Sequence, residues 1–443
     1  MKTVLYTCPY VPAEWIAAHG LRPWRIVCSA AGPDAVAARR EGMCAYARSF
    51  LNEALSRSEV DAVVMTTLCD QMRRAFDVPA VGPIRAFLLN IPATWQSAGA
   101  FDYYVEELRR LGRFLVAVGG LEPSSAHLTA IMGQYQAARR SILGARPGRT
   151  ARRWAELVER FGRGGPAGLD EAPDPPQDAA EGREARDEAD GWQRFAQRRP
   201  DSVRPLPSVK AATPTQYAMR HRNDEIALAI IGGPLLKQDF DIYDLIEDNG
   251  GRIVFDATET GERGWPGQFD PAALAEDPLT ALGRAYFEGV RDPSRRPNDP
   301  LHAWLKDACR SHRVRGVIYY RHLWCDAWHA ELSRVKHTLG LPVLAIEAAC
   351  EGVTAGQGGT RDDGRTTDMN HGLTRIDTDC RADKASRRLG GGLSRSEGLD
   401  RPALAFGKGR HPSAMRNTQD AIRNTKCGQR TADRIMAFFE MLR

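Results

Sequence analysis

Short apolar runs alternate with amphipathic segments along most of the chain, and the alternation predicts the fold class. The first third contains apolar runs at 2–6, 21–27, 60–66 and 84–92, and segments with helical spacing at 12–19, 42–55 and 101–115. Apolar runs of this length indicate buried strands. Strands that alternate with helices favour a parallel sheet with crossover connections.

The same alternation resumes after residue 224 and predicts a second α/β unit. Its strands are expected at 225–236, 252–258, around Val317 and Ile318, and at 341–348, with helices at 239–251, 277–290, 299–312 and from the Cys325 loop to Leu339. We therefore expect an α/β fold of two Rossmann-like parallel-sheet domains, joined by a helical connection and carrying two flexible insertions.

The pattern also predicts how the chain is divided. An N-terminal α/β domain is expected at 1–150, a helical segment with a flexible linker at 151–222, and a C-terminal α/β domain at 223–357. Residues 162–207 and 358–426 are rich in Gly and charged residues and have few apolar positions, which favours a loose linker and an irregular insertion. Residues 427–443 predict a terminal helix with Ile435, Phe438, Phe439 and Leu442 on one side.

Composition narrows the class of protein. The chain has 443 residues, 42% of them hydrophobic and 26% charged, with a net charge of +5 from scattered basic residues. These values are ordinary for a large globular enzyme and give no nucleic-acid signature. No apolar window is long enough for a signal peptide or a membrane span, so we expect a cytoplasmic protein with reduced thiols among its nine cysteines.

Two distant stretches, VDAVVMTTLCDQMRR (60–74) and VRGVIYYRHLWCDAWHAEL (314–332), share one design. In each, an apolar run leads through a few residues to Cys-Asp and then to a helical segment, so Cys69 and Cys325 are expected just beyond strand carboxyl ends. Open α/β sheets place ligands there. Asp70 and Asp326 are predicted as helix N-caps.

Cys44 is also predicted at a helix start, after the Gly-Met of GMCAYARSF. Thiols at Cys44, Cys69 and Cys325 suit either an iron–sulfur cluster with an open iron or a catalytic zinc. The alternative for each cysteine is a small buried hydrophobe, which we expect for the other six. Among those six, Cys8 and Cys350 lie near predicted strand ends.

Several of these segments are similar to those of a known family. The chain resembles the 2-hydroxyacyl-CoA dehydratase D-component family, which includes benzoyl-CoA reductase subunits and double-cubane cluster proteins. The pieces that carry the resemblance occur in the family's order: YVPAEWIAAHGLRPWRI, CAYARS, VVMTTLCDQMRR, IGGPL, DLIEDNGGRIVFDATETGER, GVIYYRHLWCD and LPVLAIEAACEGVTAGQGGTR. One departure is a second Gly-Gln, at 428 and 429, beyond the insertion that follows Gly356-Gln357 and Thr360-Arg361.

The resemblance implies that Cys44, Cys69 and Cys325 hold a [4Fe-4S] cluster between both α/β domains. It implies an acyl-CoA substrate, an ATP-dependent iron–sulfur activator that injects one electron, and a paralogous or identical partner subunit. The reaction implied is radical dehydration or reduction of the acyl-CoA. Two other functions stay open: a double-cubane-type ATP-dependent reductase, with Cys8 and Cys350 as extra ligands, and a non-catalytic cluster-bearing partner subunit.

Four further residues are candidates for substrate binding. Glu14 is placed to face a substrate, or else is an ordinary acid in a first helical turn. Gly232 and Gly233 follow a strand and could cradle a phosphate of CoA, or form a plain turn. Glu347 follows a buried strand and could line the cleft, or form a salt bridge.

Overall fold

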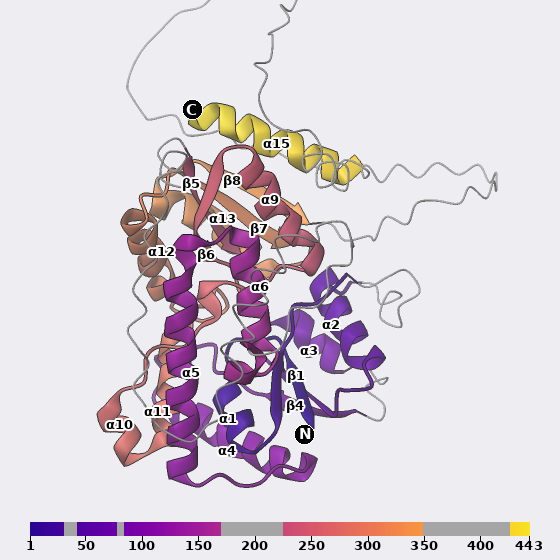
Figure 1. Cartoon of the computed structure of the whole chain (residues 1–443), viewed down its shortest axis with the longest axis vertical. Helices are drawn as coiled ribbons and strands as arrows, with labels where there is room; N and C mark the ends of the chain where they lie inside the picture. The colour runs from indigo at the N-terminus through magenta and orange to yellow at the C-terminus, as the bar shows by residue number, and fades with distance from the viewer. Residues whose placement is uncertain (31–41, 78–83, 170–224, 349–425) are drawn as a thin grey trace, which may run out of the picture.

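The structure is a computed structural model that describes residues 1–30, 42–77, 84–169, 225–348 and 426–443. Within these ranges the chain forms two parallel sheets with helices packed around them (Figure 1). No helix among the described residues is both long and apolar enough to cross a membrane. The predicted insertion at 358–426 lies outside the described residues, except for Lys426, as does most of the predicted linker.

The first sheet is formed by four strands in the order β2-β1-β3-β4, all parallel. Its strands are β1 (Thr3–Tyr6), β2 (Arg22–Arg25), β3 (Ala62–Thr66) and β4 (Arg85–Leu89), and its helices are α1 (Ala13–Ala18), α2 (Ala45–Ser56), α3 (Asp70–Phe76) and α4 (Ala100–Val118). All five residues of β3 are buried, as a strand covered on both faces requires. We call this sheet and these helices the first lobe.

The second sheet repeats the connectivity of the first, in the order β6-β5-β7-β8. Its strands are β5 (Ile226–Gly232), β6 (Gly251–Ala257), β7 (Gly316–His322) and β8 (Val343–Ala348), and the helices between them are α9 (Asp241–Asp248), α10 (Pro271–Glu276), α11 (Pro278–Gly289), α12 (Asp299–Ser311) and α13 (Asp326–Leu339). The sheet with α9, α12 and α13 is the second lobe. The prediction of two parallel-sheet α/β units is confirmed.

Two helices connect the lobes. They are α5 (Ser125–Ala145) and α6 (Ala151–Gly162), and Figure 1 shows both running lengthwise between the sheets. Helix α6 contacts β2 of the first lobe and both α9 and β6 of the second. Arg152 fixes it to α9 through ion pairs with Asp241 and Asp244, at 2.5 and 2.6 Å. The helical connection therefore sets how the lobes face each other.

Helices α10 and α11 leave the second sheet and lie beside α5 (Figure 1). Leu282, Tyr286 and Phe287 of α11 are buried in one core with Tyr104 and Leu108 of α4. The core of the first lobe thus draws on residues from both halves of the sequence, and α11 brings side chains from the second half next to the strand ends of the first sheet.

Helix α15 (Lys426–Leu442) covers part of the second sheet. Its residues Ile435, Phe438, Phe439 and Leu442 are buried in a core with residues of β5, β7 and β8. They are the four residues that the apolar pattern placed on one side of a terminal helix. The residues before this helix, 349–425, lie outside the described ranges, so the helix was predicted from its own apolar pattern and not from its neighbours in the chain.

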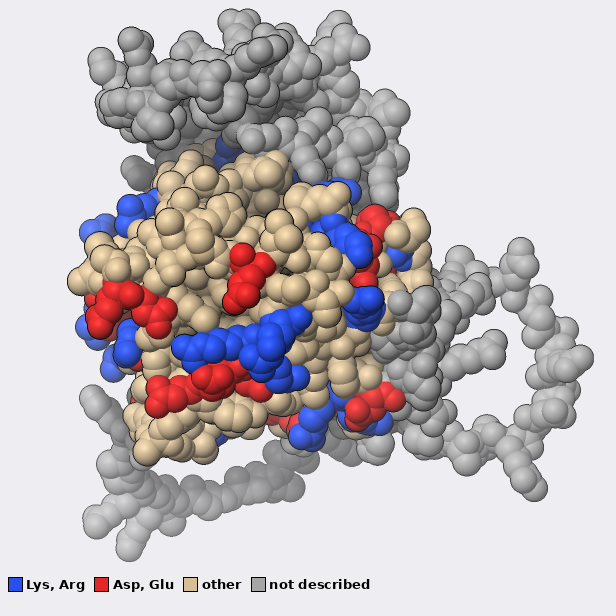
Figure 2. Space-filling model, turned by 90° about the horizontal axis from the view of Figure 1, so that it is seen from below, with Lys and Arg blue, Asp and Glu red and all other residues tan. Residues whose placement is uncertain are grey.

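Charged side chains show no large region of one sign on the face seen in Figure 2. Basic and acidic residues alternate there over the described part of the chain. Over the described residues as a whole, exposed ion pairs within single helices include Arg109 with Glu106 and Arg284 with Glu288. This arrangement is that of a solvated surface.

Candidate functional site

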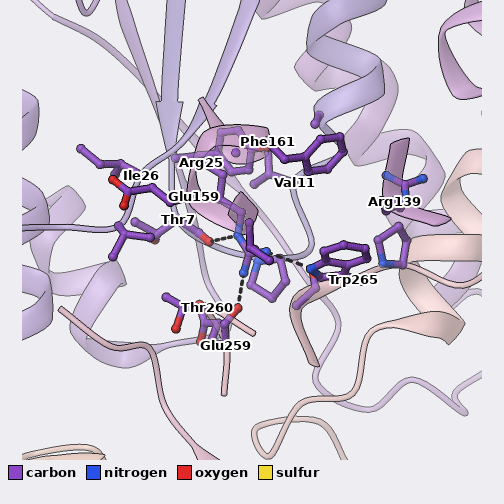
Figure 3. A pocket seen from close by; sticks show the side chains of 18 of the residues that line it. Thr7, Val11, Arg25, Ile26, Arg139, Glu159, Phe161, Glu259, Thr260 and Trp265 are labelled. Carbon is purple, nitrogen blue, oxygen red and sulfur yellow. Dashed lines mark hydrogen bonds between the residues drawn. The ribbon is translucent and has the colours of Figure 1, made fainter. Parts of the chain in front are cut away.

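Residues just beyond the carboxyl ends of strands in the two sheets contact each other. Arg25, at the end of β2, donates hydrogen bonds to the carbonyl oxygens of Thr7, Glu259 and Gly264 at 2.9, 2.6 and 3.0 Å. Thr7 belongs to the first lobe, whereas Glu259 and Gly264 follow β6 of the second. Figure 3 shows these bonds at the centre of a cavity between the lobes.

The three predicted thiol ligands lie at equivalent places in the secondary structure. Cys44 is the N-cap of α2, Cys69 the N-cap of α3 and Cys325 the N-cap of α13. The prediction that Asp70 and Asp326 are the N-caps was wrong, because each helix begins one residue earlier and both aspartates are first-turn residues. A thiol at an N-cap points its sulfur toward free backbone N–H groups, and the Ala47 N–H lies 3.4 Å from Cys44 Sγ.

The three thiols influence one another's ionisation. Cys69 keeps an exposed surface, but the protein atoms around its thiol displace water and raise its pKa, and the neighbouring thiols of Cys44 and Cys325 raise that pKa further. Burial raises the pKa of Cys325 to about 11, with contributions from Cys44 and Glu259. The effect requires that sulfurs from both lobes be near each other. Among the described residues, no group of three His, Cys, Asp or Glu side chains converges closely enough to hold a single metal ion.

The three cysteines differ in their exposure to solvent. Cys44 is buried, Cys325 is partly buried and Cys69 is exposed. A side-chain contact also links two of their loops, since the Cys44 backbone N–H donates to Gln71 Oε1 at 2.8 Å, and Gln71 lies in the first turn of α3. The start of α2 is thereby tied to the start of α3.

The remaining cysteines divide into three kinds. Cys28 and Cys309 are buried. Cys8 lies near the candidate site, where burial raises the pKa of its thiol to about 12 and Glu259 raises it further, while a hydrogen bond from Thr66 lowers it. Cys350, Cys380 and the side chain of Cys427 lie outside what the structure describes.

Glu14 is buried in the first turn of α1 and is held by two partners. Its Oε1 forms an ion pair with Arg139 Nη1 at 2.5 Å, and its Oε2 accepts a hydrogen bond from the Tyr286 hydroxyl at 2.6 Å. These partners come from α5 and α11, so the carboxylate joins three helices around the cavity. A role for Glu14 in substrate binding stays a prediction.

Gly232 is required by close backbone packing. Its φ is +154°, and a Cβ there would lie 1.8 Å from the Tyr320 carbonyl oxygen. The Gly233 N–H donates to the same oxygen at 3.2 Å. This hydrogen bond occupies the Gly233 N–H, and close packing alone explains the glycine at 232. Phosphate binding by Gly232 and Gly233 stays a prediction.

Glu347 lies in β8 and forms an ion pair with Arg321 of the neighbouring strand β7. This is the salt bridge that the sequence offered as the alternative to a cleft-lining role. Its side chain is partly exposed, and substrate binding by Glu347 likewise stays a prediction.

Glu259 is a candidate that the sequence analysis missed. It lies two residues beyond β6, and its carboxylate raises the pKa of Cys8, Cys44 and Cys325. Burial raises its own pKa, while Arg263 and Arg25 lower it. A loop anchored by Asp256, which accepts hydrogen bonds from the backbone and hydroxyl of Thr258, carries it. Its only sequence signal is its place after a predicted strand.

The cavity in Figure 3 is lined by residues of both lobes and of helices α5, α6 and α11, and no described cysteine is among them. Its links to the candidate thiols are Tyr46, two residues after Cys44, and Glu259, whose charge raises the pKa of Cys44 and Cys325. Arg139 and Tyr286 also line the cavity, and in this view Arg139 lies on the far side of Trp265 from Glu259. Much of the wall between is apolar, with Val11, Ile26, Val27, Val158, Phe161, Trp265 and Pro266.

The family model for the 2-hydroxyglutaryl-CoA dehydratase D-component matches residues 8–152 and 200–442. The chain belongs to this family. The matched ranges include Cys44, Cys69 and Cys325 as well as Glu14 and Glu259. The D-component family is generally associated with iron–sulfur clusters, and it implies work alongside an activator and a paralogous subunit.

Other comparisons add little to this assignment. No match was found among curated proteins. Among solved structures, the chain is similar to a manganese-bound periplasmic metal-binding protein from Candidatus Liberibacter asiaticus, at 10% identity, with 80% of this chain and 92% of that chain covered. The TM-score of 0.19 is too low to inform the fold or the site of this D-component chain.

Proposed function

We propose that this D-component chain is the iron–sulfur subunit of an acyl-CoA dehydratase, with Cys44, Cys69 and Cys325 as ligands of a [4Fe-4S] cluster. The observation that carries the proposal is the electrostatic coupling of three N-cap thiols from two lobes. A cubane cluster binds each thiolate to a different iron, so its ligands need not converge on one point as ligands of a single ion do.

The donor set fits such a cluster chemically. Thiolates are the usual ligands of iron–sulfur clusters, and three of them leave one iron without a protein ligand. In the metal-free protein each thiol has a raised pKa because burial and neighbouring negative charges oppose ionisation. Cationic iron removes that obstacle, and the N-cap positions add backbone N–H groups that stabilise sulfur charge. When bound, the cluster supplies an electron and an open iron next to the thioester.

The chain's own groups have three tasks in this proposal. Arg25 donates hydrogen bonds to carbonyl oxygens of both lobes, which holds the lobes, and with them the three thiols, in fixed relative positions. The apolar wall of the cavity excludes water from the acyl group. Glu259 lines the cavity and acts electrostatically on Cys44 and Cys325, so we assign it the role of accepting a proton from the bound acyl chain; burial raises its pKa, which makes its carboxylate a stronger base.

The proposal includes three partners: an ATP-dependent iron–sulfur activator as electron donor, a paralogous subunit or a second copy of the chain, and an acyl-CoA. The second candidate function is a double-cubane-type reductase, which Cys8 favours by its position near Glu259. A third is a cluster-bearing subunit without catalytic activity of its own.

Iron and acid-labile sulfide per chain test the proposal directly. We expect about four of each after anaerobic purification, whereas a double-cubane protein would contain about eight. Cys69→Ser is expected to abolish the cluster's electron paramagnetic resonance signal while the far-ultraviolet circular dichroism spectrum is retained, because Cys69 is exposed and packs little.

A matched control is Cys309→Ser, in α12. Cys309 is buried in the core of the second lobe beside Leu301 and Leu305, and its thiol is not coupled to the other three. This variant should keep its iron. Full iron content in the folded Cys69→Ser protein would remove Cys69 from the ligand set.

A further inference from the structure

Arg295, in the loop between α11 and α12, has hydrogen-bonding capacity that the fold does not use. It is 5% exposed, and its Nη1 donates to the carbonyl oxygen of Phe287 and, at 3.3 Å, to the hydroxyl of Tyr10. Its Nε and Nη2, which form one edge of the guanidinium plane, are buried and have no hydrogen-bond partner among the described residues. Of the described arginines, only Arg295 leaves this whole edge unpaired. Buried donors without an acceptor are costly, so an acceptor is expected there.

Aromatic rings hold the Arg295 side chain in place. Its Cζ lies 4.2 Å from the ring centre of Phe287, 5.4 Å from that of Tyr10 and 5.5 Å from that of Trp95. Ring faces attract the cation, but they do not replace an oxygen acceptor in the guanidinium plane. Because Tyr10 and Trp95 come from the first half of the chain and Phe287 from α11, the guanidinium is fixed between segments of both halves.

A second guanidinium, that of Arg291, lies near Arg295. Burial lowers the pKa of Arg291 and the charge of Arg295 lowers it further, while Tyr10 raises it. The Nη1 of Arg291 donates to the carbonyl oxygens of Glu288, at 2.7 Å, and Gly289, and its Nε is buried and unpaired among the described residues. Two like charges in a water-poor place repel each other, and an anion beside them relieves that repulsion.

The carboxylate of the same loop is engaged elsewhere. Asp292 Oδ2 pairs with Arg263 Nη1 at 3.1 Å, and Asp292 Oδ1 accepts a hydrogen bond from the Ser294 backbone N–H at 2.8 Å. Within the described ranges, no ion pair includes Arg291 or Arg295. The loop therefore has positive charge that its own carboxylate does not neutralise.

Residues 90–99, which connect β4 with α4, pack against this loop. The Arg296 backbone N–H donates to the Ala93 carbonyl oxygen at 2.7 Å, and Trp95 Nε1 donates to the Pro297 carbonyl oxygen at 2.7 Å. The same segment also lines an open hollow at the start of α4. Because this segment contacts both the loop of Arg295 and the hollow, it provides a route from solvent to the buried edge.

We propose that Arg295 and Arg291 form a buried binding site for a compact oxyanion, a phosphate or a carboxylate group, where the loop after α11 meets the first lobe. Two oxygens of the anion accept hydrogen bonds from Arg295 Nε and Nη2 in a bidentate arrangement, and the charge of Arg291 favours its binding. The site is distinct from the cavity in Figure 3, because neither arginine lines that cavity. The inference goes beyond the proposed function and does not depend on it.

Calorimetric titration of the full-length protein with inorganic phosphate and with acetate, in chloride buffer of constant ionic strength, tests the site. We expect one of the two to bind at one per chain with a Kd of about 1 mM or tighter. Arg295→Lys keeps the charge but loses the planar edge, so it should weaken this binding roughly tenfold. Equal affinity in Arg295→Lys and the unchanged protein would overturn the proposal.

An oxyanion that stays bound through purification would block the titration, so the denatured protein is first analysed by ion chromatography. One retained oxyanion per chain, lost in Arg295→Lys, is the equivalent positive result. Neither a retained oxyanion nor binding of either probe would overturn the proposal.

Arg284→Lys is the matched control. Arg284 lies in α11, is exposed and pairs with Glu288 at 2.9 Å, so its replacement should leave oxyanion binding as it was. If Arg295→Lys does not fold, Arg291→Gln removes one of the two charges and should weaken binding roughly threefold. Unchanged affinity in folded Arg291→Gln would contradict a site formed by both arginines.

Coenzyme A distinguishes two sources of the oxyanion. If a phosphate of coenzyme A occupies the site, coenzyme A competes with inorganic phosphate, and its own affinity falls in Arg295→Lys. If coenzyme A leaves phosphate binding unchanged, the site takes a free oxyanion. Both results keep the site, and neither changes the iron content by which the proposed function is tested.

Discussion

The first sheet runs β2-β1-β3-β4, and the second repeats this connectivity as β6-β5-β7-β8. In each lobe a cysteine follows the third strand of the chain order, three residues after Thr66 in one and three after His322 in the other. The lobes differ after their edge strands. The first lobe continues from β2 toward Cys44, whereas the second places Glu259 just beyond β6.

This difference explains how two similar lobes form an asymmetric site. The topologically equivalent positions each provide one thiol, and the third thiol comes from the first lobe alone. The second lobe provides a carboxylate, Glu259, whose charge acts on thiols of both lobes.

The largest expected effect comes from removing the thiol of the second lobe. Cys325→Ser should lose iron as completely as Cys69→Ser, because a cluster shared by both lobes needs ligands from both. Iron and sulfide analysis of the two variants, prepared in parallel, checks this. If Cys325→Ser kept its full iron content, the cluster would belong to the first lobe alone, and the comparison of the lobes would lose its functional meaning.

The second prediction concerns the first strand of each lobe. β1 ends at Tyr6, whereas β5 ends at Gly232, whose backbone approaches Tyr320 too closely for any side chain. Gly232→Ala should lower the free energy of unfolding by about 3 kcal/mol or more, through steric overlap and an unfavourable φ. Urea denaturation followed by circular dichroism measures the change.

Gly233→Ala provides the adjacent comparison. A Cβ at Gly233 would lie 3.5 Å from Trp328 Cδ1, which is an ordinary contact. This variant should change the free energy of unfolding by less than about 1 kcal/mol. Equal destabilisation by both alanines would show that the requirement for glycine is not specific to the contact with Tyr320.

The strands of both sheets could be predicted from the sequence because each strand is marked by its own local apolar pattern. β3 and β5 are apolar runs bounded by turns, and α15 has a clear apolar side even though it follows a long undescribed stretch. The packing partner of α11 was not predictable in the same way. Its amphipathic pattern shows that one face is buried but not in which core, and the structure places Leu282 and Phe287 in the first lobe.

The candidate site was predicted only where chemistry coincided with the end or start of a predicted element. Cys69 and Cys325 follow predicted strands and Cys44 opens a predicted helix, and the structure brings the starts of their helices to one region. Arg139 and Glu259 did not attract notice, because an arginine within a helix and a glutamate in a loop are common at surfaces. What distinguishes them is a buried ion pair with Glu14 for Arg139 and nearby thiols for Glu259, and these neighbours exist only once distant segments have packed together.

The smallest expected effect tests how Glu259 acts on thiols of both lobes. Its negative charge raises the pKa of Cys44 and of Cys325, the latter to about 11 with burial as the main cause. Glu259→Gln removes that charge, so the thiol pKa should fall and more thiolate should be present at any pH below it. Alkylation of metal-free protein by iodoacetamide, followed by peptide mass spectrometry, should then be up to about fivefold faster at both residues. Glu262→Gln, three residues further along the same loop, pairs with Arg146 instead and should leave both rates unchanged. A rate increase at Cys44 alone would mean that Glu259 acts mainly on the first lobe and does not link the thiols of both.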